Sequence, residues 1–242
     1  MLRTSGTKLL AAALTVVLAG VCLADGYLIH GRRPAAAPPA GNHFYDDFAD
    51  NLDDWTHVGW TPAVSSEQFT ETGNGASIYD AGSNTNGDGY ACVTLVSVTD
   101  YPGIMFRANV DATNRSYVVR VEVGNSVKWR YCLAGSCSDI ESDTQTVNAG
   151  EHLAVKWTGT SDSTVVDWYV FAGGVGCSGC TGAGCDTSGW AAAARISGQF
   201  TNSPPGCPGS CTYPELGTNR YGGLYNGGSS TVTFDDFYFG DD

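Results

Sequence analysis

Acidic residues near the two ends of the folded region are the first candidates for chemistry. The segment "FYDDFAD", residues 44–50, and the segment "TVTFDDFYFG", residues 231–240, share the motif Asp-Asp-Phe. Adjacent carboxylates inside an apolar strand cost free energy unless something pairs with them. Asp side chains supply oxygen ligands for calcium, and they also cap turns by accepting hydrogen bonds from backbone N–H groups. The residues alone leave both interpretations open.

A second group of carboxylates lies in "SDIESD". Asp139, Glu141 and Asp143 alternate along the chain, so in a regular strand they share one face. Two carboxylates at a suitable separation cleave glycosidic bonds. The segment lacks the large apolar residues of a core strand, which favours an exposed edge or a loop. The four His show no grouping, and no nucleophile elbow, phosphate loop or H-E-x-x-H motif is present. We therefore predict no catalytic residue.

Aromatic side chains in loop sequence are candidates for binding sugars. Trp60 in "VGWTP", Trp190 in "SGWAAAA" and Tyr213 in "CTYPEL" are the three that we predict to bind carbohydrate. Aromatic rings suit partly wet surfaces, where their faces can stack on sugar rings. The alternative is that each ring packs beneath a nearby disulfide. Three further Trp belong to alternating apolar strands and are predicted to lie in the core: Trp129, Trp157 and Trp168.

The cysteines indicate an oxidising compartment. There are nine, and removal of Cys22 with a signal peptide leaves eight, an even number. Two pairs bracket tight Gly/Ser turns that bring their Cβ atoms close, and these are predicted disulfides: Cys132 with Cys137, and Cys207 with Cys211. The run "CSGCTGAGC" has a C-x-x-C spacing that also suits a metal, but the absence of a nearby His favours disulfides. Four cysteines stay unassigned: Cys92, Cys177, Cys180 and Cys185.

Period-two alternation of apolar residues predicts an all-β fold. Residues 117–123 and 127–131 alternate on either side of a "GNS" turn, which indicates a hairpin. Residues 90–98 are apolar on both faces, as in a central strand. About ten to twelve short strands without helical crossovers predict an antiparallel two-sheet sandwich. Residues 173–213 are rich in Gly, Pro and Cys, so we expect a long, disulfide-rich loop insertion in that sandwich.

The N-terminal part predicts export. Residues 1–24 combine Arg3 and Lys8 with an apolar run and a small-x-small pattern before Asp25, which is typical of a signal peptide. An uncleaved anchor is the alternative. Residues 25–42 form a Pro/Ala-rich linker, and residues 43–242 form the predicted domain. The formal net charge of −13 argues against a nucleic-acid partner. We expect a secreted or cell-surface protein with no membrane contact unless the N-terminal segment is retained.

Two longer segments carry a family resemblance. "FYDDFADNLDDWTHVG" near the start and "YGGLYNGGSSTVTFDDFYFG" at the end resemble the concanavalin A-like lectin/glucanase superfamily, laminin-G-like jelly rolls included. The resemblance spans roughly residues 43–242 and implies two antiparallel sheets of six or seven strands, with the terminal strands adjacent. It also implies a structural calcium, for which Asp235 and Asp47 (or a backbone carbonyl near Asp47) match the ligands.

Members of this superfamily either bind glycans or cleave them. The cleaving branch carries E-x-D-x-x-E on one strand, and this chain has no such motif. We therefore predict a secreted, non-catalytic glycan-binding or surface-adhesion module whose partner is a polysaccharide or glycan. The alternatives are a polysaccharide-degrading enzyme with an unrecognised site and a structural envelope or matrix protein.

Overall fold

A computed structural model describes ten stretches of the chain. They are residues 42–49, 52–59, 62–84, 88–109, 116–122, 125–133, 136–159, 164–174, 176–201 and 221–242. All of them belong to one compact unit, Pro38–Asp242. The predicted signal peptide and all but the last residue of the predicted linker lie outside the described residues. No helix within the ten stretches has the length and apolar character needed to span a membrane.

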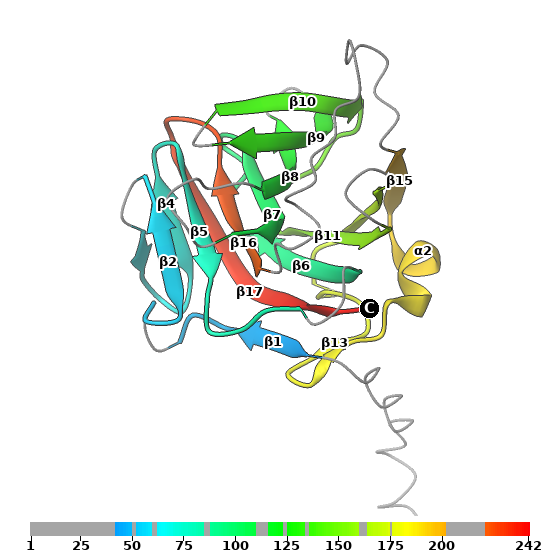
Figure 1. Ribbon diagram of the computed structural model, residues 1–242, viewed down its shortest axis with the longest axis horizontal. Helices are drawn as coiled ribbons and strands as arrows, with labels where there is room; N and C mark the ends of the chain where they lie inside the picture. Colours follow the sequence, from blue (N-terminus) through cyan, green and yellow to red (C-terminus); the bar gives the residue numbers. More distant parts are fainter. Residues whose placement is uncertain are drawn as a thin grey trace, which may run out of the picture. The chain divides into compact units, whose positions relative to one another are not determined.

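Two large antiparallel sheets form a sandwich, which confirms the predicted fold class (Figure 1). Sheet A runs in the order β15 (Ile196–Thr201), β12 (Val165–Phe171), β11 (Glu151–Thr158), β6 (Gly89–Leu95), β17 (Thr231–Asp241), β4 (Phe69–Thr72) and β3 (Ala63–Val64), with β1 (His43–Asp46) also paired to β17. Sheet B runs in the order β10 (Ser136–Asp143), β9 (Ser126–Leu133), β8 (Ser116–Glu122), β7 (Pro102–Ala108), β16 (Tyr221–Asn226), β5 (Gly75–Tyr79) and β2 (Trp55–Val58). Within the described residues the sheets have eight and seven strands, one more in sheet A than the family resemblance implies.

The core lies between the two sheets and follows from the alternation. Trp129, Trp157 and Trp168 point into it and are at most 1% exposed, as predicted. The strand that is apolar on both faces, β6, lies between β11 and β17 in the middle of sheet A. The predicted hairpin is formed by β8 and β9. Alternating residues thus supply the inward faces of both sheets.

The terminal strands are neighbours, as expected. β1 pairs with β17, with His43 opposite Gly240 and Asp46 opposite Phe237. The register of β17 against β6 shifts between Asp235 and Tyr238, and Asp236 has a φ of 49°. An extra residue in a bulge reverses the side-chain parity. For this reason Phe237 lies in the same core as Phe234, although simple alternation puts them on opposite faces.

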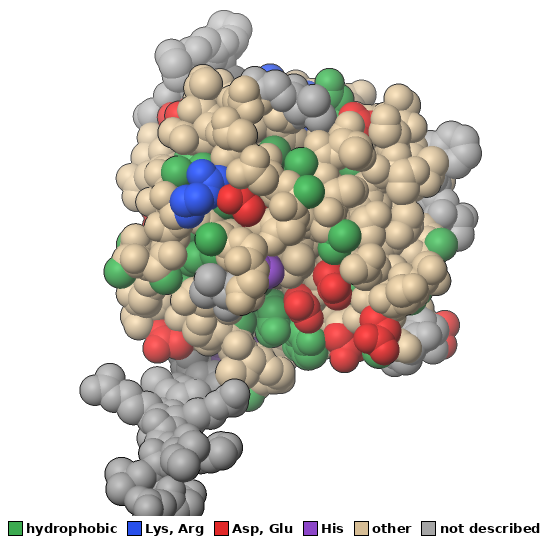
Figure 2. Space-filling model, turned by 180° about the vertical axis from the view of Figure 1, so that it is seen from behind, with side chains coloured by type: hydrophobic (Ala, Val, Ile, Leu, Met, Phe, Trp, Pro, Cys, Tyr) green, Lys and Arg blue, Asp and Glu red, His purple; other side chains and the backbone are tan. Residues whose placement is uncertain are grey.

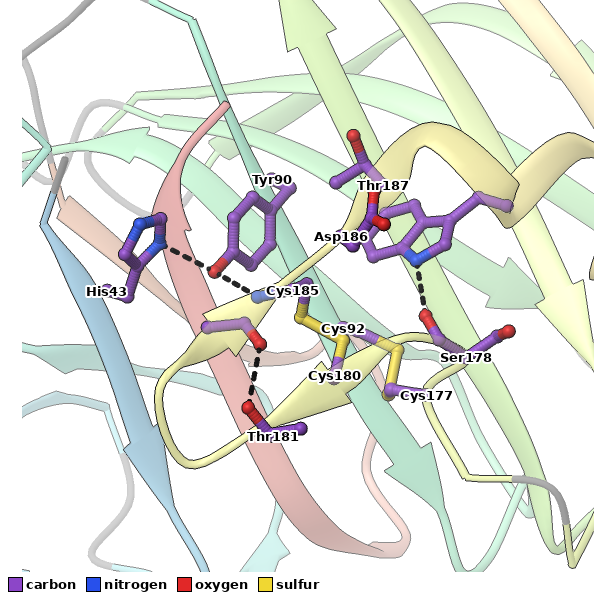
Figure 3. Close-up of a disulfide and its surroundings, with 12 residues drawn as sticks. His43, Tyr90, Cys92, Cys177, Ser178, Cys180, Thr181, Cys185, Asp186 and Thr187 are labelled. Atoms are coloured by element: carbon purple, nitrogen blue, oxygen red, sulfur yellow. Dashed lines mark hydrogen bonds between the residues drawn. A yellow bond between two sulfur atoms is a disulfide. The ribbon is translucent and has the colours of Figure 1, made fainter. Parts of the chain in front are cut away.

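A disulfide-stapled insertion covers part of the outer face of sheet A. It contains β13 (Cys180–Thr181), β14 (Gly184–Cys185), η1 (Thr187–Gly189) and α2 (Trp190–Ala193). Cys177 is bonded to Cys92 of β6, and Cys180 is bonded to Cys185 (Figure 3). Tyr90 of β6 accepts a hydrogen bond from the backbone N–H of Cys185 at 2.9 Å. The insertion is therefore tied covalently and by hydrogen bonding to the middle of the sheet.

Candidate functional site: a pocket on the outer face of sheet B

The outer face of sheet B carries its own apolar cluster. The cluster contains Ala76 and Ile78 of β5, Met105 of β7, Val118 of β8 and Tyr225 of β16. These residues alternate with inward-facing neighbours such as Ile104, Val119 and Leu224, which belong to the sandwich core. The same period-two pattern that fills the interior therefore also places apolar side chains on the outside of this sheet.

A pocket opens on this face. Its volume is about 110 Å³, and its lining includes Val58, Asn74, Met105, Ser116 and Tyr225. The residues come from β2, the β4–β5 turn, β7, β8 and β16. Pockets that enclose a whole small ligand usually measure roughly 300–1,000 Å³. This pocket has the size to hold one end or one unit of a larger ligand.

The Cys132–Cys137 disulfide forms one wall of the pocket. It joins β9 to β10 at the turn between them, where Cys132 and Cys137 are directly opposite in register. The pairing was predicted from the tight turn between the two cysteines, and the structure confirms it. The Sγ of Cys137 lies 3.5 Å from the hydroxyl of Tyr225, so this disulfide links the β9–β10 hairpin to β16.

Ser116 is a polar residue of the pocket lining with an unusual environment. Its side chain is fully buried, and among the described residues its Oγ has no hydrogen-bond partner. A buried hydroxyl without a partner costs about 1–3 kcal/mol. Asn74 adds an exposed side-chain amide at the rim. The pocket thus combines apolar walls with a few hydrogen-bonding groups, which is the composition of small-ligand sites.

The predicted sugar-binding aromatics do not form this site. Trp190 is fully buried under the insertion, where its Nε1 donates a 2.6 Å hydrogen bond to the carbonyl of Ser178 (Figure 3). Its ring makes edge contacts with Tyr90, Tyr169 and Phe171. The expectation of an exposed ring at Trp190 is wrong, because the loop folds back onto sheet A. Four other predicted residues lie outside the described residues: Trp60, Cys207, Cys211 and Tyr213.

The carboxylates of "SDIESD" also separate in the structure. β10 is an edge strand, as predicted, but its register shifts between Asp139 and Glu141. Asp139 forms ion pairs with Lys128 and Arg130 of β9. Glu141 instead accepts a 3.1 Å hydrogen bond from the backbone N–H of Thr201 in β15. The two side chains therefore have different partners, and neither lines the pocket.

The predicted calcium ligands lie near the junction of β1 and β17. Asp47 accepts a 3.1 Å hydrogen bond from the N–H of Ala49, and Asp235 accepts one of 3.0 Å from the N–H of Asp236. Burial, and then the charge of Asp236, raises the pKa of Asp235. In the part of the chain that the structure describes, no group of three or more His, Cys, Asp or Glu side chains is arranged to hold a metal. Calcium needs six to eight oxygen ligands, so these side chains alone do not fit it.

Sequence reasoning did not find the pocket residues. Val58, Met105, Ser116 and Tyr225 are far apart in the chain and share no motif. The one available signal is "YGGLYNGG", where glycines flank Tyr225 in a strand. Gly inside a strand marks places where another group approaches the backbone closely.

Comparisons with known proteins concern the fold. No protein-family model matches the chain, and no curated protein matches it either. Among solved structures, carbohydrate-binding module CBM66 from Bacillus subtilis is similar with 18% identity and a TM-score of 0.47, over 75% of this chain and 92% of that one. The GH43 protein BlXynB from Bacillus licheniformis has 15% identity and a TM-score of 0.48, over 80% and 38%. Lectin II from Ulex europaeus has 11% identity and a TM-score of 0.43, over 83% and 99%.

The architecture of this chain is an antiparallel two-sheet jelly-roll sandwich. Its two antiparallel sheets, with the first and last strands adjacent, are the arrangement that the sequence resemblance implies. At identities below 20% and these TM-scores, the solved structures carry no information about what this chain binds.

Proposed function

We propose that the protein is a secreted, non-catalytic glycan-binding module that holds one sugar unit of a larger glycan in the sheet B pocket. The observation that carries the proposal is Ser116, a residue of the pocket lining whose buried hydroxyl has no partner among the described residues. A rotation of this side chain toward the pocket would let a ligand hydroxyl become its partner.

The chemistry of the pocket suits a sugar. A pyranose has apolar C–H faces and a rim of hydroxyl groups. Met105 and the ring of Tyr225 offer apolar surface, while Ser116 and Asn74 offer hydrogen bonds. Directional polar groups that are unpaired without ligand also give specificity, because a ligand that lacks the matching hydroxyl leaves them unpaired.

Export is supported by the covalent structure. Three disulfides are formed within the described residues, and such bonds persist in oxidising compartments. The apolar N-terminal segment with its preceding positive charges supports the same proposal.

Binding is favoured over hydrolysis by the lining of the pocket. Glycoside hydrolysis requires two carboxyl groups that flank the scissile bond. The described residues that line the pocket include no Asp or Glu. The nearest candidates from the sequence, Asp139 and Glu141, are held by separate partners.

The test compares Ser116→Ala with Ser77→Ala in a glycan-array and polysaccharide-binding screen, with reducing-sugar release measured in parallel. Ser77 is also fully buried, but its hydroxyl is bonded to His57. We expect Ser116→Ala to weaken glycan binding about tenfold without loss of stability, because it removes an unpartnered hydroxyl. Ser77→Ala should reduce stability and leave binding unchanged. Unchanged binding by Ser116→Ala, or sugar release by the wild type, would overturn the proposal.

A further inference from the structure

Basic side chains are concentrated on the outer face of sheet B. The described residues include six Lys or Arg: Arg107, Arg120, Lys128, Arg130, Lys156 and Arg195. Three of them, Arg120, Lys128 and Arg130, lie on the adjacent strands β8 and β9. Each alternates with core residues such as Val119 and Trp129, so all three project from the outer face. In a chain of net charge −13, this is a local reversal of sign.

Two carboxylates compensate these cations only in part. Lys128 Nζ lies 3.0 Å from Glu122 and 3.0 Å from Asp139. Arg130 Nε lies 2.5 Å from Asp139, and Arg120 pairs with Glu122. Three cations against two carboxylates leave a net charge of +1 on this cluster. Hydrogen bonds to Asp139 and then Glu122 raise the pKa of Lys128, which stays charged at neutral pH.

The basic cluster adjoins the pocket. Nη2 of Arg130 donates a 2.9 Å hydrogen bond to the carbonyl of Cys137, which lines the pocket. The side chains of Arg120 and Tyr225 both lie next to Gly227. A Cβ atom added to this glycine would be 2.6 Å from Nη1 of Arg120 and 3.0 Å from the hydroxyl of Tyr225, so the two side chains are close to each other. A glycan unit in the pocket therefore has cationic side chains beside it.

Asp139 is the most exposed member of the cluster. Its side chain is 45% exposed, against 23% for Lys128 and 15% for Arg130. It also belongs to the edge strand β10, whereas its partners lie on the inner strand β9. Its two oxygens are shared between Arg130 Nε and Lys128 Nζ, an arrangement that a planar carboxylate satisfies.

We propose that the pocket selects a glycan that carries uronate groups, and that a uronate carboxylate replaces Asp139 between Lys128 and Arg130. This inference rests on the proposed glycan-binding function and adds the chemical class of the ligand. In the free protein, Asp139 pairs with Lys128 and Arg130. Its position shows where the carboxylate of a ligand would bind.

The experiment measures binding of the full chain to polygalacturonate and to the same polymer after complete methyl esterification, which removes the charge and keeps the sugar. We expect the wild type to bind polygalacturonate at least about tenfold more tightly, because hydrogen bonds to charged groups are the stronger ones. Lys128→Gln should weaken that binding about tenfold. Asp139→Asn should strengthen it about threefold or more, because it removes the competing carboxylate.

A matched control is Lys156→Gln. Lys156 is paired with Asp242 at 2.6 Å, but it lies on sheet A. It should leave binding to both polymers unchanged. Urea unfolding of each variant establishes that the protein is folded.

The outcomes separate the inference from the function on which it rests. Equal binding to the esterified polymer overturns the uronate inference and keeps glycan binding. Weaker binding by Asp139→Asn shows that Asp139 supports the site structurally and overturns the exchange. Tighter binding of dextran sulfate than of polygalacturonate reassigns the cluster to sulfate esters and overturns the uronate class. Binding of no neutral or anionic glycan defeats both proposals.

Discussion

The outer faces of the two sheets share an apolar character but differ in what covers them. On sheet A, Tyr90, Tyr169 and Phe171 pack with Trp190 of the insertion. On sheet B, Met105 and Tyr225 line a pocket instead. The insertion thus packs against the apolar outer face of sheet A, whereas the described residues leave a pocket on that of sheet B. The loop that the sequence marks for sugar binding, around Trp190, is the cover of the other sheet.

The two faces also differ in charge. Figure 2 shows acidic side chains gathered in one region of the face that it presents, which also carries a group of Lys and Arg side chains. Around the bulge of β17, the charge of Asp236 acts on both Asp235 and His152 of sheet A. Arg120, Lys128 and Arg130 project from sheet B. From this difference in charge we expect different partners for the two faces: cations at the β1–β17 junction and anions beside the pocket.

The largest expected effect concerns the disulfide that fastens the insertion to sheet A. Cys92 and Cys177 are separated by 85 residues. A disulfide that closes so long a loop stabilises by about 4–5 kcal/mol in the chain-entropy model. The double variant Cys92→Ala/Cys177→Ala should lose that stability in urea unfolding while the folded fraction keeps its glycan affinity. Loss of affinity in the folded protein would contradict the assignment of binding to sheet B.

The next effect concerns Trp190, the buried ring by which the insertion packs on sheet A. Trp190→Ala should destabilise the fold by about 4 kcal/mol, because large-to-small substitution leaves a cavity. It also leaves the carbonyl of Ser178 without its donor. Calorimetric unfolding measures the loss, and glycan affinity should not change. A weaker glycan complex with unchanged stability would restore the role that the sequence predicts for Trp190.

Between the two sheets, a buried acid should make stability depend on pH. Glu71 of β4 lies opposite Val232 in register, is fully buried, and has no hydrogen-bond partner for either carboxyl oxygen among the described residues. Burial raises its pKa from 4.5 to about 8. Between these values the folded state keeps a proton that the unfolded state releases, so stability falls as the pH rises. Glu71→Gln removes this loss and should gain on the order of 3 kcal/mol at pH 7.

The measurement is the free energy of unfolding of both proteins at several pH values from 4 to 9. The difference should be small near pH 4 and grow until about pH 8. His57 and His152 have lowered pKa values from burial, and they titrate in both proteins, so their contribution cancels. A constant difference across this range would show that Glu71 keeps its ordinary pKa. Glu71 lies between the sheets and not on either outer face, so Glu71→Gln should leave glycan affinity unchanged. That affinity serves as the control.

What could be predicted from the sequence follows from local pattern. Alternation placed Trp129 and Trp157 in the core, and the tight turn predicted the Cys132–Cys137 bond. The resemblance carried by the two terminal segments correctly implied that the first and last strands lie side by side. Each of these rests on neighbours in the chain or on the family resemblance of its ends.

What could not be predicted depends on contacts between distant segments. The Cys92–Cys177 bond joins residues 85 apart, and eight cysteines allow 105 pairings. Trp190 has the sequence surroundings of an exposed loop, and only its contacts with β6 and β12 bury it. The unpartnered state of Ser116 likewise depends on which groups the fold brings near it.

A smaller effect is expected from calcium at the β1–β17 junction, which stays a prediction. Calcium that binds the folded state alone adds about 2.7 kcal/mol at a hundredfold excess over its Kd. Thermal unfolding with calcium and with chelator tests this on the wild type and on Asp235→Asn. The control is Asp186→Asn. Asp186 is an exposed acid in the insertion that accepts a hydrogen bond from the N–H of Ser188. An unmoved wild-type midpoint would leave the acidic pairs as turn caps, like Asp46, which accepts a 2.7 Å hydrogen bond from the N–H of Phe48.

The smallest effect on stability is expected from removal of a short-loop disulfide. The same change should separate the two faces most clearly by its effect on glycan affinity. Two disulfides have the same sequence separation of five residues: Cys132–Cys137 on sheet B and Cys180–Cys185 on the insertion over sheet A. Loops this short give about 2 kcal/mol each in the chain-entropy model. Replacing either pair by Ala should therefore cost a similar stability. Only the Cys132→Ala/Cys137→Ala protein should lose glycan affinity, by about tenfold, because its disulfide is a wall of the pocket and contacts Tyr225. Equal affinities in the two double variants would show that the sheet B pocket is not where the glycan binds, since the pair over sheet A controls for the general loosening of a short loop.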